Sequence, residues 1–240
     1  MNESMDSMTC DIAVIGGGPA GMMAAGTAAA NGADVILIEK NRRPGRKLLI
    51  TGKGRCNITN AAPDVRGFLE QFGKKGRYLH SLLHAFSVDD AMSFFTGRGC
   101  PVKVERGNRV FPESDSAADV LRVLQEYIKE HGVRVLYGRE VLGLARENSH
   151  VTRITTGDGD IEARQIILCT GGLSYPATGS TGAGLEFCRD LGHTVVKPRP
   201  SLVPVILKEK WTGEIEGLSL RNVTVRLIHD GRTAGEEFGE

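Results

Sequence analysis

The sequence has few features of a secreted, metal-binding or membrane-spanning protein. Its five cysteines are scattered and odd in number, and no C-x-x-C pair suggests a zinc site or a disulfide framework. The six histidines form no metal-like cluster, so we expect no metal site. No apolar run reaches membrane-spanning length, and the first ten residues lack the apolar core of a secretion signal. We therefore expect a cytoplasmic protein without a membrane partner.

The chain also lacks an excess of charge of either sign. Its 30 lysines and arginines nearly balance 29 aspartates and glutamates, giving a formal net charge of +1. This balance gives no electrostatic reason to expect a nucleic-acid partner. Glycine, by contrast, is abundant at 31 of 240 residues, as expected where a backbone turns sharply or approaches phosphates.

Glycines first cluster in residues 11–40, which read DIAVIGGGPAGMMAAGTAAANGADVILIEK. An apolar run leads into Gly16, Gly18 and Gly21, a small-residue helix follows, and a second apolar run ends at Glu39. This is the dinucleotide fingerprint G-x-G-x-x-G in a strand–turn–helix–strand context. We expect the glycines to admit a pyrophosphate at the helix N-terminus, and Glu39 to accept hydrogen bonds from a ribose.

The remaining pattern predicts an α/β fold. We expect a Rossmann-like FAD-binding domain with a parallel central sheet and a small antiparallel β-meander, followed by the start of a second, β-rich domain. Strands are expected at 11–15, 34–39, 133–137 and 165–169, helices at 19–31, 116–132 and 185–191, a hairpin at 102–111, and meander strands at 141–145, 151–155 and 160–163. We divide the chain into a loose leader (1–10), the FAD-binding domain (11–199) with a helical insertion at about 61–100, and an incomplete β-rich domain (200–240).

The last forty residues change in character. Strands are expected at 202–207 and 223–228, and the sequence Asp230-Gly231-Arg232 predicts a turn. We find no pattern for a return strand after this turn. The expectation is therefore a truncated polypeptide, cut inside a hairpin.

The fingerprint alone does not separate FAD from NAD, but three further features favour FAD. A basic, glycine-rich loop at 41–60 directly follows Glu39, where it can reach a pyrophosphate and a flavin edge. The meander after the third strand is similar to the insertion of two-dinucleotide flavoproteins. The strand at 166–169 ends in Thr170-Gly171-Gly172, small residues that allow a cofactor to approach closely.

Several longer motifs are far more specific than the fingerprint. They are GGGPAG (16–21), GRKLLITGKGRCNITN (45–60), RVFPESDSAADV (109–120), TGGLSYPATGSTGAG (170–184), PSLVPV (200–205) and GLSLRNV (217–223). With these motifs the chain resembles the two-dinucleotide-binding flavoproteins and, more narrowly, the BaiN-type or aminoacetone-oxidase-like NAD(P)/FAD-dependent oxidoreductases. Members of that family have about 400 residues, which agrees with the expected truncation.

The resemblance implies a set of FAD contacts. By motif, the expected contacts are Gly16, Gly18, Pro19, Ala20 and Gly21 at the pyrophosphate, Glu39 and Lys40 at the adenosine ribose, Arg46 and Lys47 at the phosphates or ribityl chain, Arg55, Cys56 and Asn57 near the isoalloxazine ring, Val141 at the adenine, and Thr170, Gly171 and Gly172 closing over the cofactor. A thiol at Cys56 beside a flavin invites a redox role, whereas the alternative is a small residue packed in a tight loop.

The sequence thus predicts an FAD-dependent oxidoreductase with NAD(P)H as the electron donor implied by resemblance. The expected substrate is a small organic molecule, through reduction of an enone-type double bond or oxidation of an amine. No residue is identified as catalytic. The alternatives are an NAD(P)-dependent dehydrogenase with a single Rossmann domain, a non-catalytic dinucleotide-binding protein, and a tRNA-modifying flavoprotein, against which the balanced charge argues.

Overall fold

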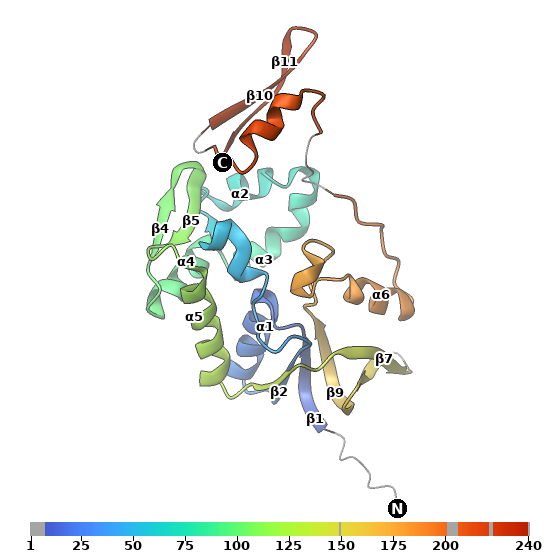
Figure 1. Ribbon diagram of the computed structural model, residues 1–240. Helices are drawn as coiled ribbons and strands as arrows, with labels where there is room; N and C mark the ends of the chain where they lie inside the picture. The colour runs from blue at the N-terminus through green and yellow to red at the C-terminus, as the bar shows by residue number, and fades with distance from the viewer. Residues whose placement is uncertain (1–7, 149, 201–205, 221–222, 240) are drawn as a thin grey trace, which may run out of the picture. The chain divides into compact units, whose positions relative to one another are not determined.

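The computed structural model describes residues 8–148, 150–200, 206–220 and 223–239. The chain divides into two compact units, with the boundary between Val195 and Val196 (Figure 1). No helix in the described part of the chain is long and apolar enough to cross a membrane.

The first unit is built on a six-stranded sheet in the order β6-β2-β1-β9-β8-β7. Of these strands, β1, β2, β7 and β9 are labelled in Figure 1. Its strands are β1 (Met8–Ile15), β2 (Val35–Glu39), β6 (Arg134–Tyr137), β7 (Val141–Glu147), β8 (His150–Thr156) and β9 (Gly159–Leu168). The strands β6, β2, β1 and β9 are parallel, whereas β8 and β7 continue the same sheet in antiparallel pairing. The predicted Rossmann-like fold class with a parallel central sheet and a meander is therefore confirmed.

Two strand predictions need correction. The two short strands expected at 160–163 and 165–169 form one strand, β9, because pairing with β1 continues past the exposed Arg164. The predicted leader is also too long, since β1 begins at Met8. Residues 8–10 pair with residues 161–163 of β9, and this backbone pairing extends the strand beyond the apolar run that marked it.

Alternating residues of the central strands bury both faces of the sheet. Val14 and Leu37 face α1 (Pro19–Ala30) and α5 (Ala117–Glu130), while Ile15 and Ile38 pack on the opposite face. This double burial explains why these strands read as continuous apolar runs. The two helices pack closely, because a Cβ on Gly26 of α1 would lie 2.4 Å from the ring of Tyr127 in α5.

The predicted helical insertion lies between the basic loop and the predicted hairpin. It contains α2 (Val65–Glu70), η2 (Gly73–Leu79), α3 (His80–Ala85) and α4 (Val88–Gly97). Ser87 and Asp90 form a capping box at the start of α4. A three-stranded sheet, β3-β5-β4, flanks the insertion, with β3 before it in the chain and β4 and β5 after it. Its elements are β3 (Thr59–Asn60), β4 (Val102–Glu105), η3 (Arg106–Asn108) and β5 (Arg109–Pro112). The hairpin expected at 102–111 is therefore present.

The first unit also contains η1 (Leu48–Gly54), η4 (Pro176–Thr178) and α6 (Ala183–Asp190). The second unit contains η5 (Lys210–Ile215) and the two strands β10 (Val223–His229) and β11 (Arg232–Gly239). The prediction that no return strand follows β10 is wrong, because β11 pairs with it in antiparallel register. Asp230 and Gly231 both have positive φ, as a tight hairpin turn requires. The strand expected at 202–207 falls mainly outside the described residues.

Candidate dinucleotide-binding site

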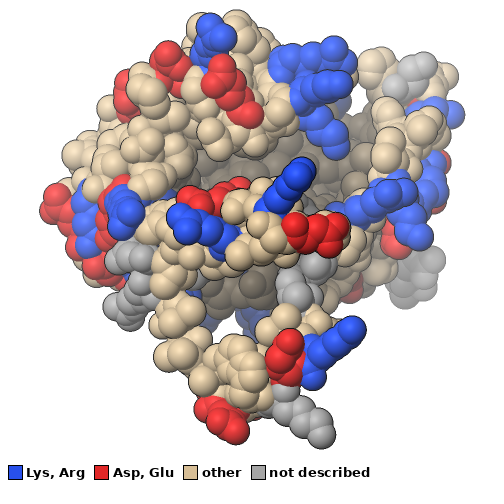
Figure 2. All heavy atoms as spheres, turned by 90° about the horizontal axis from the view of Figure 1, so that it is seen from above, with Lys and Arg blue, Asp and Glu red and all other residues tan. Residues whose placement is uncertain are grey.

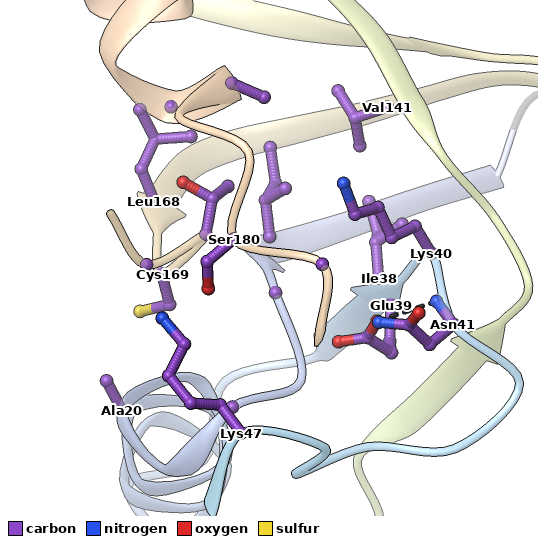
Figure 3. A pocket seen from close by; sticks show the side chains of 18 of the residues that line it. Ala20, Ile38, Glu39, Lys40, Asn41, Lys47, Val141, Leu168, Cys169 and Ser180 are labelled. Carbon is purple, nitrogen blue, oxygen red and sulfur yellow. Dashed lines mark hydrogen bonds between the residues drawn. The ribbon is translucent and has the colours of Figure 1, made fainter. Parts of the chain in front are cut away.

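A pocket of about 580 Å³ lies at the carboxyl ends of β1, β2 and β9 (Figure 3). This is the edge at which open α/β sheets bind ligands, and the volume is in the range of small-molecule sites. The predicted residues that line it are Gly16, Gly18, Pro19, Ala20, Glu39, Lys40, Arg46, Lys47, Val141, Thr170 and Gly171. Gly21, Arg55, Cys56, Asn57 and Gly172 are not part of its wall.

The three fingerprint glycines have different surroundings. Gly16 has a φ of 108°, and a Cβ there would lie 2.4 Å from the carbonyl oxygen of Cys169. A Cβ on Gly21 would lie 1.8 Å from the carbonyl oxygen of Gly16, so this glycine permits close packing of helix on strand. A Cβ on Gly18 would meet no atom within 4 Å, although Gly18 lines the pocket. Gly16 and Gly21 thus allow close approach between backbone segments of the protein, whereas Gly18 leaves space for a ligand.

The N-terminus of α1 opens onto this space. Gly18 is the N-cap residue in an extended conformation and Pro19 occupies the first turn. The structure describes every residue of α1 and of the turn before it. Within this segment no side chain caps the helix N-terminus, and no acidic residue lies in the first turn. The free N–H groups and the positive end of the helix dipole therefore suit a phosphate.

Glu39 is buried at the end of β2 and holds two loops together. Its Oε2 accepts a hydrogen bond of 2.7 Å from the backbone N–H of Gly17, within the fingerprint turn. Its Oε1 accepts bonds from the backbone N–H of Asn41, at 2.7 Å, and from the Asn41 side-chain amide, at 2.6 Å. Each carboxylate oxygen has more than one acceptor site, so the carboxylate retains capacity for a ribose hydroxyl.

Basic side chains line the pocket. Lys40 Nζ donates to Thr181 Oγ1 at 3.3 Å and lies 3.9 Å from Glu140. Arg46 Nη1 donates to Asn41 Oδ1 at 2.8 Å. Lys47 extends into the pocket near Cys169 and Ser180 in Figure 3. These cations can compensate the charge of a bound pyrophosphate.

A second glycine-rich loop, residues 176–182, closes one side of the pocket. Thr178 O accepts a hydrogen bond of 3.3 Å from Asn41 Nδ2, and a Cβ on Gly179 would lie 2.8 Å from the same nitrogen. Asn41, Ser180 and Arg139 line the pocket but were not predicted. The position of Asn41 directly after Glu39-Lys40 is a signal that would have identified it. Nothing local marks Arg139, which reaches the site through the turn between β6 and β7.

The loop predicted to lie near the flavin ring is fastened to the β4–β5 hairpin. Arg55 forms ion pairs with Glu105 and, at 2.8 Å, with Asp115, and its guanidinium lies 4.0 Å from the centre of the Phe111 ring. Hydrogen bonds from Lys103 and Arg55 lower the pKa of Asp115. The predicted ring contacts of Arg55, Cys56 and Asn57 stay predictions, since these residues lie outside the pocket wall.

Two cysteines bear on a redox role, Cys56 of the predicted flavin loop and Cys169 of the pocket wall. Cys56 is buried with a φ of 61°, and burial raises the pKa of its thiol. Burial likewise raises the pKa of Cys169, which lines the pocket. A raised pKa disfavours the thiolate, so burial favours a packing role for both side chains over a reactive one. Among the described residues, no group of three or more His, Cys, Asp or Glu side chains is placed to bind a metal.

Comparison with known proteins gives the family. Residues 10–235 match the family model described as "HI0933-like protein Rossmann domain". The chain is 33% identical to the 3-dehydro-bile acid delta(4,6)-reductase of Clostridium scindens, over 95% of this chain and 55% of that protein. It is 29% identical to the ribosomal RNA dihydrouridine synthase of Escherichia coli, over 87% of this chain and 51% of that protein.

Solved structures show the same fold. An open conformation of a flavocytochrome c3 fumarate reductase superposes with a TM-score of 0.62 at 23% identity, covering 78% of this chain and 41% of that one. The chain spans about half the length of the curated relatives it matches. Because the family model covers nearly the whole chain, the resemblance in the motifs is confirmed, and the chain belongs to the HI0933-like Rossmann family.

Proposed function

We propose that the pocket at the carboxyl ends of β1, β2 and β9 binds FAD. The observation that carries this proposal is the open space beside Gly18, directly at the uncapped N-terminus of α1. A pyrophosphate would be held by the N–H groups of this helix end and by Lys47, with Arg46 at the rim. The ribose of the adenosine would be held by Glu39, and the adenine would lie near Val141, while Thr170 and Gly171 would close over the cofactor.

For the reaction, we propose an FAD-dependent oxidoreductase that reduces a carbon–carbon double bond conjugated to a carbonyl group. Bound FAD would supply hydride transfer, with NAD(P)H as the electron donor. Two relatives support reduction over amine oxidation. One is named for reducing a bile-acid derivative, and the other for forming dihydrouridine. The uracil C5–C6 double bond is conjugated to the C4 carbonyl, so the two names describe the same chemical class of acceptor.

An anaerobic titration tests this proposal. The FAD-loaded chain is mixed with NADH or NADPH, and the flavin absorbance is followed before and after a conjugated enone is added. We expect bleaching by at least one of the two donors, reoxidation by the enone, and a product heavier by two hydrogens. The saturated ketone is the matched control, because it lacks only the double bond. If the reduced flavin were instead reoxidised by an imine, the oxidised form of an amine, and not by the enone, the amine-oxidase alternative would be favoured.

The charge and acceptor capacity of Glu39 give a further prediction. In Glu39→Gln one acceptor oxygen becomes an NH₂ group that faces the N–H of Gly17 or that of Asn41, so the contact with one loop is lost. The remaining contacts, including that with the ribose, lose the negative charge of the acceptor. We expect the dissociation constant for FAD to rise at least about tenfold, since a hydrogen bond to a charged group contributes about 1.5–3 kcal/mol. Isothermal titration calorimetry measures this change.

Glu140→Gln is the control for that variant. Glu140 lines the same pocket, and its replacement by glutamine removes the same charge. Its side chain is 64% exposed, however, and the substitution weakens only a 3.9 Å contact with Lys40. We expect an affinity close to that of the unchanged chain. Equal losses in both variants would show that Glu39 acts only through the charge of the pocket.

A further inference from the structure

The helical insertion has a basic and aromatic surface that the cofactor site does not use. We define the insert surface as Lys74, Lys75, Arg77, Tyr78, His80 and His84, all of which are exposed. These residues come from η2 and α3, within one short stretch of chain. Arg77, His80 and His84 also line a shallow hollow in this part of the first unit, whose opposite wall, from α2 and the residue before it, carries Asp64, Arg66 and Glu70.

The charge of this surface is local. Lys74, Lys75 and Arg77 place three cations within four residues, and within the described part of the chain none of them forms an ion pair with an acid. Figure 2 shows basic and acidic side chains interspersed over the face that it presents, in keeping with the net charge of +1. The expectation of no nucleic-acid partner was drawn from that whole-chain balance, which does not reveal a local cluster.

The aromatic side chains add flat faces beside these charges. Tyr78 is 68% exposed, and the Arg77 guanidinium lies 4.9 Å from its ring centre and donates a 2.8 Å hydrogen bond to its hydroxyl. The rings of His80 and His84 lie 4.6 Å apart. Unpaired bases stack on exposed tyrosine, histidine and arginine planes, while neighbouring cations bind the phosphates. An acidic peptide offers carboxylates for the cations but no flat bases for the rings.

We propose that the insert surface binds single-stranded RNA. Lys74 and Lys75 contact phosphates, and a base stacks on Tyr78. We choose RNA over DNA because RNA contains uracil, whose conjugated double bond belongs to the class of acceptor named in the proposed function. The choice of RNA rests on that proposed function. The binding step does not, because it requires neither FAD nor a reducing agent and is measured separately.

Fluorescence anisotropy with a fluorescein-labelled single-stranded RNA of mixed sequence tests the proposal. We expect K74E/K75E to lower the affinity at least tenfold. It should also reduce the slope of log K against log salt concentration by about 1.4, because each lost phosphate contact on a single strand contributes about 0.7. Tyr78→Ala should weaken binding severalfold without changing that slope, since stacking on an aromatic ring contributes independently of salt.

The matched control is K129E/R146E, which makes the same change in charge at two exposed positions on α5 and β7. Thermal melts followed by circular dichroism show that each variant is folded. Equal losses in the control and in K74E/K75E would overturn the proposal, as would polyglutamate binding as tightly as RNA. Single-stranded DNA of the same sequence binding more tightly than RNA would overturn the assignment to RNA. Loss of FAD binding with intact RNA binding would overturn only the proposed function.

Discussion

Replacing Gly18 with valine is expected to abolish FAD binding while the fold remains intact. The backbone of Gly18 has a φ of −77° and a ψ of 179°, which any residue adopts, and a Cβ there meets no protein atom within 4 Å. The added side chain would therefore occupy the space where we place the pyrophosphate. We expect the dissociation constant for FAD to rise more than about 100-fold, about 2.7 kcal/mol. Stability should fall by no more than about 1 kcal/mol, the cost of a poor N-cap residue.

Gly143→Val is the control for this variant. Gly143 lies in β7, away from the pocket wall, and a Cβ there also meets nothing within 4 Å. Its valine variant should bind FAD as the unchanged chain does. FAD retained by Gly18→Val with unchanged affinity would contradict the placement of the pyrophosphate at the N-terminus of α1.

Replacing Gly21 with alanine is expected to fail in a different way, by destabilising the fold itself. The new Cβ would lie 1.8 Å from the carbonyl oxygen of Gly16 and 3.3 Å from Cβ of Cys169. Because these are backbone and buried atoms, α1 must shift away from β1, and the core between α1 and α5 must repack. We expect the free energy of unfolding to fall by about 3 kcal/mol or more, the upper end for overpacked cores. Urea unfolding followed by circular dichroism measures this loss.

Gly97→Ala provides the comparison. Gly97 is the last residue of α4, is exposed, and has open space where its Cβ would be placed. Alanine there should be neutral or slightly stabilising, by up to about 1 kcal/mol, because it restricts the unfolded chain. If Gly21→Ala were as stable as Gly97→Ala, the close approach of helix and strand at the fingerprint would be incorrect.

The sequence predicted those parts of the fold in which buried and exposed residues recur with a regular spacing or in which glycines mark a sharp turn. The fingerprint located β1, α1 and β2 because glycine spacing and buried strands leave a strong local pattern. The hairpin β4–β5 was found from Gly107-Asn108 at its turn. The amphipathic α5 was found from the spacing of its apolar residues.

Other elements leave no such pattern. The strand β11 reads RTAGEEFG, in which polar and glycine residues hide a strand that is held by backbone pairing with β10. In the site, the sequence placed Glu39 and Lys47 at the pocket but did not reveal Ser180 or Arg139. These residues reach the pocket through loops whose course depends on distant contacts, such as the hydrogen bond between Asn41 and Thr178.

The central proposal is that this pocket binds FAD, and the visible absorption spectrum of the purified chain tests it most directly. We expect the two bands of an oxidised flavin after purification or after incubation with FAD and removal of the excess. Heat denaturation should then release FAD, identified by chromatography, and Gly18→Val should be colourless beside a yellow Gly143→Val. A colourless chain that binds NAD with calorimetric heat would contradict the proposal and favour a dehydrogenase, because NAD does not absorb visible light.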